Sequence, residues 1–512
     1  MEPRTDRAPV TVSAPMGAIL QEQGIELDHV LPDYYPDVCK LVKCTVSPTV
    51  VSESIAGDRL SYELRVEVRI LYCGEDSHVL QCVTQVLHYP RTAELPAGEE
   101  ITAEIVPTVD HVNCRALSRR RLDVRGAMTI RIRPTAVRRQ EVLTDVSGLG
   151  LQAARTPVQY PAGQLRAVRR ILLSEELELG NAKPPVLHVV RCAAQAAELT
   201  QKLVSGKLLV QGSLGLQLLY ACEKDGDGSL EPMGFKLPFS QLLDIEGITE
   251  QDDCRVTCTV VSCELSPCAD TAGDVRMLRC EAELRVCCTA VRMAETALVT
   301  DAFSTEHPCE VRRTTLLTSG RPSVFGETVP ASMVLPCPDS EIDCVYDAWG
   351  EVRALTASAE GDAVVLSGML WCGVLVRESG GMPRMLEREE PFEHRFPSPG
   401  ADGDAAVDVC CTGVGCSYTL TGAAEVTVRA ELRLEGTVTQ FSRTEVVEDV
   451  TVQADEMLPR DYALLLYFGR TGEPVWDIAK RCRTTVAAIM EENDLPGDVL
   501  DADSMLLIPI VE

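Results

Sequence analysis

The sequence predicts a mainly β protein with three tandem β-sandwich-like repeats, followed by a small βααβ domain. One alternating strand pattern occurs three times, and beyond about residue 461 the pattern changes to a strand, two short helices and a strand. Hydrophobic residues make up 45 % of the 512 residues and aromatic residues only 4 %, so we expect several cores built from Val, Leu, Ala and Cys.

The repeated strand alternates apolar and polar residues, which is typical of a strand with one buried face. Its copies span Leu60–Ile70, Leu208–Leu218 and Val364–Val374. A second strand recurs at Val124–Ile132, Leu278–Val286 and Val426–Leu434. In this register Arg131, Arg285 and Arg433 are equivalent. Such repetition predicts one structural unit built three times.

The limits of the three units follow from these matches. We place them at residues 28–144, 178–305 and 325–452, each a two-sheet sandwich or a closely related sheet. The segments 145–177 and 306–324 are expected to be connectors. Within the first of them, the run Gln164–Leu179 is compatible with a helix.

The C-terminal domain, residues 461–510, has a different pattern. We expect a strand at Tyr462–Tyr467, a helix opened by Pro474 at its first position, a second helix capped by Thr484 or Thr485 and ended by Asn493, and a closing strand at Met505–Pro509. A loop at Leu495–Asp498 precedes that last strand. The order is βααβ.

Charge and segment composition narrow the classes of function. The net charge of −29 disfavours binding to nucleic acid or to an anionic membrane surface, apart from two basic clusters, Arg119–Arg121 and Arg166–Arg170, which we interpret as solvated charge. No run of residues is long and apolar enough to insert into a membrane, and the first twenty residues lack the apolar core of a signal peptide. The sequence therefore predicts a cytoplasmic protein whose 22 cysteines are reduced and fill cores.

The sequence contains no clear catalytic or metal-binding signature. The seven histidines are scattered, and no phosphate-binding loop, nucleophile turn or dinucleotide fingerprint is present. Cys254, Cys258, Cys263 and Cys268 are the nearest approach to a zinc cluster, but they lack paired CxxC knuckles. We predict no catalytic residues, no metal site and no cofactor, and hence not an enzyme.

The C-terminal domain resembles a LysM domain through Gly472, the Trp476–Arg481 helix, Asn493, Leu495 and the final Leu-Leu-Ile-Pro. LysM domains bind N-acetylglucosamine polymers such as peptidoglycan in a groove between two loops. Carried over, the groove residues are Gly472, Glu473, Pro474, Leu495, Pro496, Gly497 and Asp498. The usual Gly-Asp-Thr-Leu is Gly-Glu-Pro-Val here, and the domain is acidic, so a protein partner and a glycan both remain candidates for the groove.

The entry sequence Leu31–Asp37 (LPDYYPD), the three repeats and the terminal LysM-like domain together resemble the SPOCS-domain, SipL-like spore coat morphogenesis family of spore-forming Firmicutes. The resemblance implies a scaffold in the mother-cell cytosol, at the forespore surface. It further implies that the LysM-like domain docks a coat morphogenetic protein, a SpoIVA-like ATPase. Two alternatives stand beside this: a protein that binds peptidoglycan or cortex glycan, and an enzyme acting on the envelope.

Overall fold

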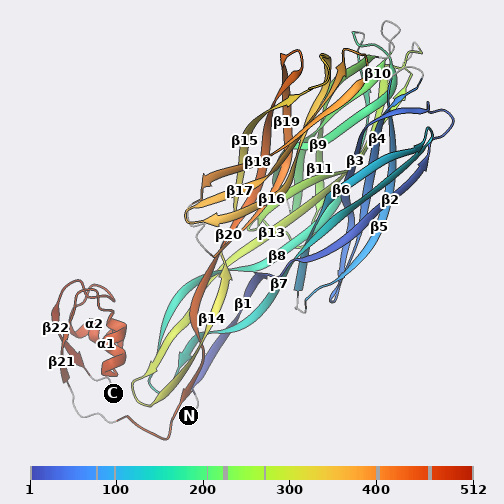
Figure 1. Ribbon diagram of the computed structural model, residues 1–512. Helices are drawn as coiled ribbons and strands as arrows, with labels where there is room; N and C mark the ends of the chain where they lie inside the picture. The colour runs from blue at the N-terminus through green and yellow to red at the C-terminus, as the bar shows by residue number, and fades with distance from the viewer. Residues whose placement is uncertain are drawn as a thin grey trace.

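The computed structural model describes residues 3–75, 79–96, 100–180, 182–204, 206–222, 229–269, 273–398, 404–458 and 464–509. It is mainly β, with three tandem sandwich-like repeats gathered into one body, a narrower stem and a small βααβ domain near the end of the stem (Figure 1). The predicted fold class is confirmed. Within the described residues neither of the two helices has the length and hydropathy that crossing a bilayer requires.

Each repeat pairs a sheet built on one long strand with a three-stranded meander. In the first repeat the long-strand sheet is β2 (Ile19–Val30), β7 (Arg121–Ser147) and β6 (Glu100–Ser118), and the meander is β3 (Val38–Ala56), β4 (Arg59–Gly74) and β5 (Leu80–Glu94). In the second they are β8 (Leu151–Glu178), β13 (Met277–Ser304) and β12 (Asp253–Cys268), with β9 (Val186–Val204), β10 (Lys207–Cys222) and β11 (Ser229–Asp244). In the third they are β15 (Ser323–Pro336), β20 (Glu425–Val452) and β19 (Ala405–Gly422), with β16 (Ile342–Glu360), β17 (Ala363–Glu378) and β18 (Pro383–Pro397).

The sandwich cores follow directly from the alternation in the sequence. In β4 every second residue from Leu60 to Ile70 is buried, because strand side chains point alternately to the two faces. The register of the second repeated strand was wrong by two residues. Strand pairing makes Leu122, not Val124, equivalent to Leu278, so Arg131 is not equivalent to Arg285. A slip of two residues keeps every side chain on its face, so the alternation alone could not detect it.

The two predicted connectors are strands. The helix suggested at Gln164–Leu179 is wrong: this run is part of β8 and pairs with β13 in the second sandwich. Residues 309–319 form β14 (Cys309–Ser319), which pairs with the end of β20. The repeat limits 28–144, 178–305 and 325–452 remain our proposal, and we propose to add β2 and β8 to the first two repeats.

The stem is made by the far halves of the three long strands. The end of β7 pairs with β1 (Arg4–Pro15), the end of β13 pairs with the start of β8, and the end of β20 pairs with β14. At equivalent places on these strands Leu143, Val299 and Val447 are fully buried against one another in one cluster. Three two-stranded ribbons thus close a common apolar core, which gives the stem an approximate threefold arrangement.

The meander sheets of the three repeats also meet. Leu71, Leu219 and Leu375, which are equivalent in β4, β10 and β17, are buried in a single cluster although they lie on the outer faces of their sandwiches. Each repeat packs against the others at these positions, which explains why the outer faces are apolar there. The three repeats form one body rather than independent beads.

The LPDYYPD segment has a structural role at the entry to the first meander. Arg120 donates hydrogen bonds to the carbonyls of Leu31, Pro32 and Tyr35 and to the Asp37 carboxylate (2.6–3.2 Å). The Tyr72 hydroxyl closes the turn by donating to the Pro36 carbonyl at 3.1 Å. In the second repeat Tyr220 donates to the Pro184 carbonyl in the same way, at 3.2 Å.

The C-terminal domain consists of β21 (Leu464–Gly469), α1 (Val475–Cys482), α2 (Val486–Glu492) and β22 (Ser504–Pro509). Pro474 stands immediately before α1 as its N-cap and not inside it. The α2 cap is Thr485, whose hydroxyl accepts from the Ala488 N–H at 3.1 Å, while Thr484 is buried and donates to the Pro509 carbonyl. Residues 461–463 and 510, which the predicted domain includes, lie outside the described residues.

Candidate functional site: the C-terminal domain

The two loops of the expected groove are joined by backbone hydrogen bonds. The Gly472 N–H donates to the Leu500 carbonyl (2.8 Å), the Leu500 N–H donates to the Glu473 carbonyl (3.1 Å), and the Val475 N–H donates to the Asp498 carbonyl (2.8 Å). Pro474 and Val499 form an isolated β-bridge. The loops that the sequence singled out, one before α1 and one before β22, are therefore neighbours in the fold.

Glu473 is held inside the domain. Its carboxylate accepts from the Tyr467 hydroxyl (2.8 Å), the Arg470 N–H (3.2 Å) and the Arg481 guanidinium (3.3 Å). Burial acts to raise the pKa of Glu473, but the hydrogen bonds from Tyr467 and Arg470 outweigh it, and the pKa is lowered. The carboxylate therefore braces the loop against α1, and little of its capacity is left for a ligand.

The other expected groove residues divide into structural and free groups. Gly472 has a φ of +81°, a conformation that favours glycine, and Leu495 packs partly against the domain core. The side chains of Pro474, Pro496 and Asp498 are exposed, and Gly497 is half-buried. The exposed side chains available to a sugar are therefore few, and none of these three is aromatic.

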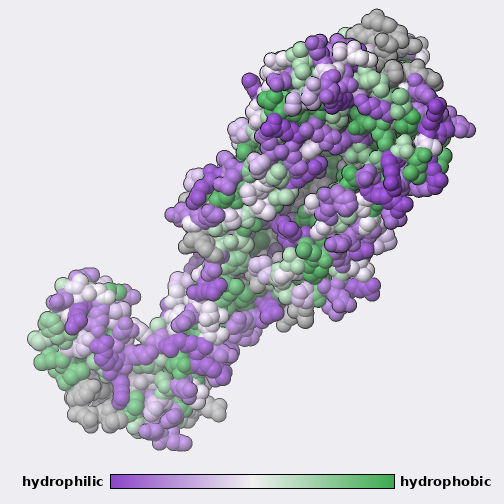
Figure 2. All heavy atoms as spheres, in the orientation of Figure 1, coloured by the Kyte–Doolittle hydropathy of each residue, from purple (hydrophilic) through white to green (hydrophobic). Residues whose placement is uncertain are grey.

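A different surface of the domain carries large exposed apolar side chains. We define the outer face as the side of the β21–β22 sheet away from the helices. Its members are Leu464, Leu466, Phe468, Met505, Leu507 and Pro509. Leu464, Leu466, Phe468 and Met505 are 52–67 % exposed, and Phe468 is directly opposite Met505 in the register. Figure 2 shows this apolar surface on the side of the domain that faces away from the stem.

The outer face arises because β21 is apolar on both sides. Leu465 and Tyr467 point inward to the core of the domain, so their neighbours in sequence must point outward. This surface was not predicted from the sequence. The signal was present: an unbroken apolar strand in a two-stranded sheet that has helices on only one side leaves one apolar face uncovered.

Helix α1 is docked on the stem through Asp301 of β13. The Asp301 carboxylate accepts from the Trp476 indole (2.9 Å), the Lys480 ammonium (2.6 Å) and the Arg313 guanidinium (2.5 Å). Phe303 is buried in the core of the domain and meets the Trp476 ring edge-on, with centroids 5.0 Å apart. These contacts occupy α1 and leave the groove loops and the outer face facing solvent.

Replacing Asp301 with Asn is expected to loosen the docking of the domain by about 2 kcal/mol, because the hydrogen bonds from Lys480 and Arg313 lose their charged acceptor and one of its two oxygens. Burial acts to raise the pKa of Asp301, but the bonds from Lys480 and Trp476 lower it below its ordinary 3.8. The contribution is thus complete above that pH and is lost as the pH falls through the lowered pKa. We expect faster hydrogen exchange of the α1 amides in Asp301→Asn and no such increase in the control Asp362→Asn, which changes an exposed residue. Unchanged exchange in Asp301→Asn would contradict the prediction.

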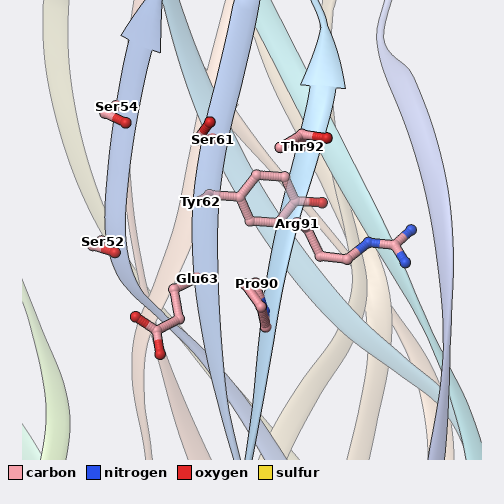
Figure 3. Close-up of a pocket in the computed structure, with 8 residues that line it drawn as sticks. All are labelled: Ser52, Ser54, Ser61, Tyr62, Glu63, Pro90, Arg91 and Thr92. Atoms are coloured by element: carbon pink, nitrogen blue, oxygen red, sulfur yellow. The ribbon is translucent and has the colours of Figure 1, made fainter.

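The first repeat has a polar pocket of about 340 Å³ on its surface (Figure 3). Tyr62 and Arg91 extend to the same side of the strands, and their polar ends bind Gln21 (2.6 Å) and Gln23 (3.0 Å) of β2. The two largest polar side chains of the pocket, Tyr62 and Arg91, are thus engaged in hydrogen bonds between the two sheets.

Arginines of both basic clusters form ion pairs, and the four cysteines of the zinc candidate lie on one strand. Arg119 pairs with Glu75, Arg121 with Asp28, Arg166 with Glu53 and Arg170 with Glu283. The four cysteines Cys254–Cys268 all lie along β12. Among the residues that the structure describes, no group of three or more His, Cys, Asp or Glu side chains has the arrangement of a metal site.

The fold and the terminal domain define a class of protein: a β-repeat body that carries a small binding module. Comparison with known proteins makes the class more specific. Residues 185–267, within the second repeat, match the family model described as the SPOCS domain of SipL, and residues 470–509 match the LysM domain. No curated protein and no solved structure matches the chain. The matches confirm the resemblance to the SipL-like, SPOCS-domain family with a C-terminal LysM domain.

Both matched domain types are non-catalytic binding modules. Together they indicate a sporulation-related protein, and the LysM match supports binding of glycans that contain N-acetylglucosamine. The terminal domain is called the LysM module below.

Proposed function

We propose that the protein is a non-enzymatic scaffold in spore coat assembly, working in the mother-cell cytosol at the forespore surface. In this proposal the LysM module docks a coat morphogenetic protein of the SpoIVA-like ATPase kind. The observation that carries it is the outer face, where four large apolar side chains are exposed side by side on one small module. Contiguous exposed apolar surface of this kind is characteristic of protein–protein interfaces.

The docking of the LysM module supports the same function. With α1 held against the stem by Asp301, the module has a defined place at one end of an elongated body (Figure 1). A partner bound at the outer face would then sit at a fixed distance from the three repeats, as a scaffold requires. The groove residues Gly472–Pro474 and Leu495–Asp498 remain our proposal for a second contact surface.

Glycan binding is the alternative, favoured by the LysM match and by the groove loops being joined. It predicts that purified sacculi pull down the chain and that a Pro496→Ala, Asp498→Ala variant is released. Both side chains are exposed, whereas Gly472 and Leu495 have structural roles, so this variant should keep the module folded.

The scaffold proposal is tested by following a fluorescent fusion of the full chain through sporulation of the source organism. We expect a shell around the forespore for the wild type and a diffuse signal for Leu466→Thr, Phe468→Thr. Threonine is well tolerated in strands, and both side chains are more than half exposed, so the module should stay folded.

The matched control replaces two exposed apolar residues outside the module, Leu172→Thr and Val324→Thr, which are 76 % and 69 % exposed. This control should keep the shell. A wild-type signal that is diffuse at every stage would refute coat scaffolding. If the shell persists in the Leu466→Thr, Phe468→Thr variant but is lost in the Pro496→Ala, Asp498→Ala variant, the partner binds at the groove and not at the outer face.

A further inference from the structure

Each repeat contains a pair of cysteine thiols that lies between its two sheets. The pairs are Cys44 of β3 with Cys114 of β6, Cys192 of β9 with Cys263 of β12, and Cys372 of β17 with Cys416 of β19. In every pair one cysteine belongs to the meander and the other to the long-strand sheet. Because no backbone ladder joins the two sheets of a repeat in the described pairings, a bond between such thiols would be a direct covalent link across the sandwich.

All three repeats have such a pair of thiols, although the cysteines do not occupy equivalent positions in every repeat. Cys44 and Cys192 are equivalent, facing Ile70 and Leu218 in the registers of their meanders. In the third repeat that place is Ala348, and the meander thiol comes instead from Cys372 on the neighbouring strand. Core filling alone would require a small apolar residue at each place, but it would not require two thiols to remain in contact.

Local geometry supports the contacts in the first and third repeats. Cys44 and Cys114 line one pocket of about 330 Å³ that opens to the surface beside Lys43. In the third repeat Cys416 lies against Gly350, where an added Cβ would come within 3.2 Å of its sulfur, and Gly350 is directly opposite Cys372 in the register. In the second repeat a third thiol, Cys280, is 4.0 Å from Cys263.

The two thiols of a pair differ in acidity. The hydrogen bond from its partner lowers the pKa of Cys114, of Cys192 and of Cys372, whereas the same bonds raise the pKa of Cys44, Cys263 and Cys416. Each pair therefore places a thiol that can ionise directly beside a second thiol; in the second repeat the bond with Cys263 lowers the pKa of Cys280 as well. A nucleophilic thiol next to a resolving thiol is the arrangement in which oxidation ends in a disulfide.

We propose that the three pairs are oxidation sites at which a peroxide forms one disulfide per repeat and so fastens the two sheets of each sandwich. The first thiolate attacks one oxygen of hydrogen peroxide, giving a sulfenic acid and, after proton transfer, water. The second thiol attacks that sulfur, the S–O bond breaks, and a second water leaves. Two thiols lose two hydrogens and one peroxide becomes two waters.

The test is peptide mapping of the folded full-length chain after a graded hydrogen peroxide treatment, without reductant. We expect linked peptides that join Cys44 to Cys114, Cys192 to Cys263 and Cys372 to Cys416, each losing two hydrogens and each reversed by dithiothreitol. Cys39, which is exposed, is the internal control: it should oxidise without joining another cysteine of the chain.

Stability provides the second readout. Peroxide should raise the thermal unfolding midpoint of the wild type, since a cross-link constrains the unfolded chain. A Cys44→Ala, Cys192→Ala, Cys372→Ala variant should show no peroxide-dependent rise. Cross-links that follow exposure rather than these pairs, or Cys263 joined to Cys280 in place of Cys192, would overturn the proposal. The proposal would also be overturned if the three pairs remained unlinked when Cys39 is fully oxidised. This outcome is measured on the wild type, so it does not depend on the variant folding.

Discussion

Replacing Arg191 with Met is expected to destabilise the contact between the second and third repeats by about 3–5 kcal/mol. Arg191 pairs with Asp347 at 2.6 Å, with the two side chains only 11 % and 18 % exposed, and its guanidinium lies 4.2 Å from the centre of the Trp349 ring. Without Arg191 a buried carboxylate is left unpaired. Hydrogen exchange of the β9 and β16 amides measures the loss of stability at this contact. A local measurement is needed because a chain of several units need not unfold in one step.

Two comparisons isolate the cause. Adding Asp347→Leu to Arg191→Met should recover most of the loss, because a buried pair replaced by apolar groups is often neutral. Lys43 occupies the equivalent place in the first repeat and pairs with Glu387 at a more exposed site, so Lys43→Met should cost only about 1 kcal/mol. Equal effects for Lys43→Met and Arg191→Met would contradict the explanation.

The Arg191→Met loss should also depend on pH. Burial raises the pKa of Asp347 even with Arg191 present, and removing the arginine raises it further. A carboxyl group with a raised pKa is best accommodated in the folded state when protonated. The penalty is therefore absent below the ordinary pKa of 3.8, grows as the pH rises from 3.8 to the raised value, and is constant above it. The variant should therefore be closest to the wild type in acid, where Asp347 is protonated in both proteins.

Replacing Asn493 with Leu is expected to unfold the LysM module. The Asn493 side chain donates to the carbonyls of Ile489 (2.8 Å) and Leu507 (2.7 Å) and accepts from the Leu507 N–H (2.7 Å), which ties the end of α2 to β22. Losing three such bonds costs about 2–4 kcal/mol, comparable to the whole stability of about 3–5 kcal/mol that so small a core supplies. Limited proteolysis should then cleave within the module while the three repeats remain intact.

The control for this change is Glu491→Gln, an exposed residue on the same helix, which should leave the module resistant to the protease. Asn493→Asp keeps the acceptor oxygen and loses the two donated bonds. Its resistance to the protease should therefore lie between that of Glu491→Gln and that of Asn493→Leu. Resistance of Asn493→Leu equal to that of the wild type would show that the packing of Ile478, Ile489 and Leu506 is sufficient without the asparagine.

The fold was predictable wherever one periodic pattern had a single interpretation. Alternation in Leu60–Ile70 and its two copies marks strands, and the order of elements beyond residue 461 predicts the LysM module. Gln164–Leu179 misled because Leu165, Val168 and Leu172 are spaced as on a helix face; pairing with β13 decides for a strand, in which Leu172 is 76 % exposed. Tertiary pairing outweighs local pattern in such cases.

The stem and the binding surfaces depend on pairings between distant segments. Nothing near Val142–Val146 in the sequence indicates that it meets β1, or that Leu143 joins Val299 and Val447. The groove loops were predictable because they flank the helices. The Asp301 contact with Trp476 links two domains and has no local signal.

The central claim is that the outer face of the LysM module docks the coat morphogenetic ATPase, and direct binding tests it. Purified ATPase from the same source would be titrated onto the immobilised full chain and onto its Leu466→Thr, Phe468→Thr and Pro496→Ala, Asp498→Ala variants. We predict saturable binding to the wild type, a loss of affinity on the order of tenfold or more for the outer-face variant, and little change for the groove variant. Equal affinity for the wild type and the outer-face variant, or no binding to the wild type, would contradict the claim.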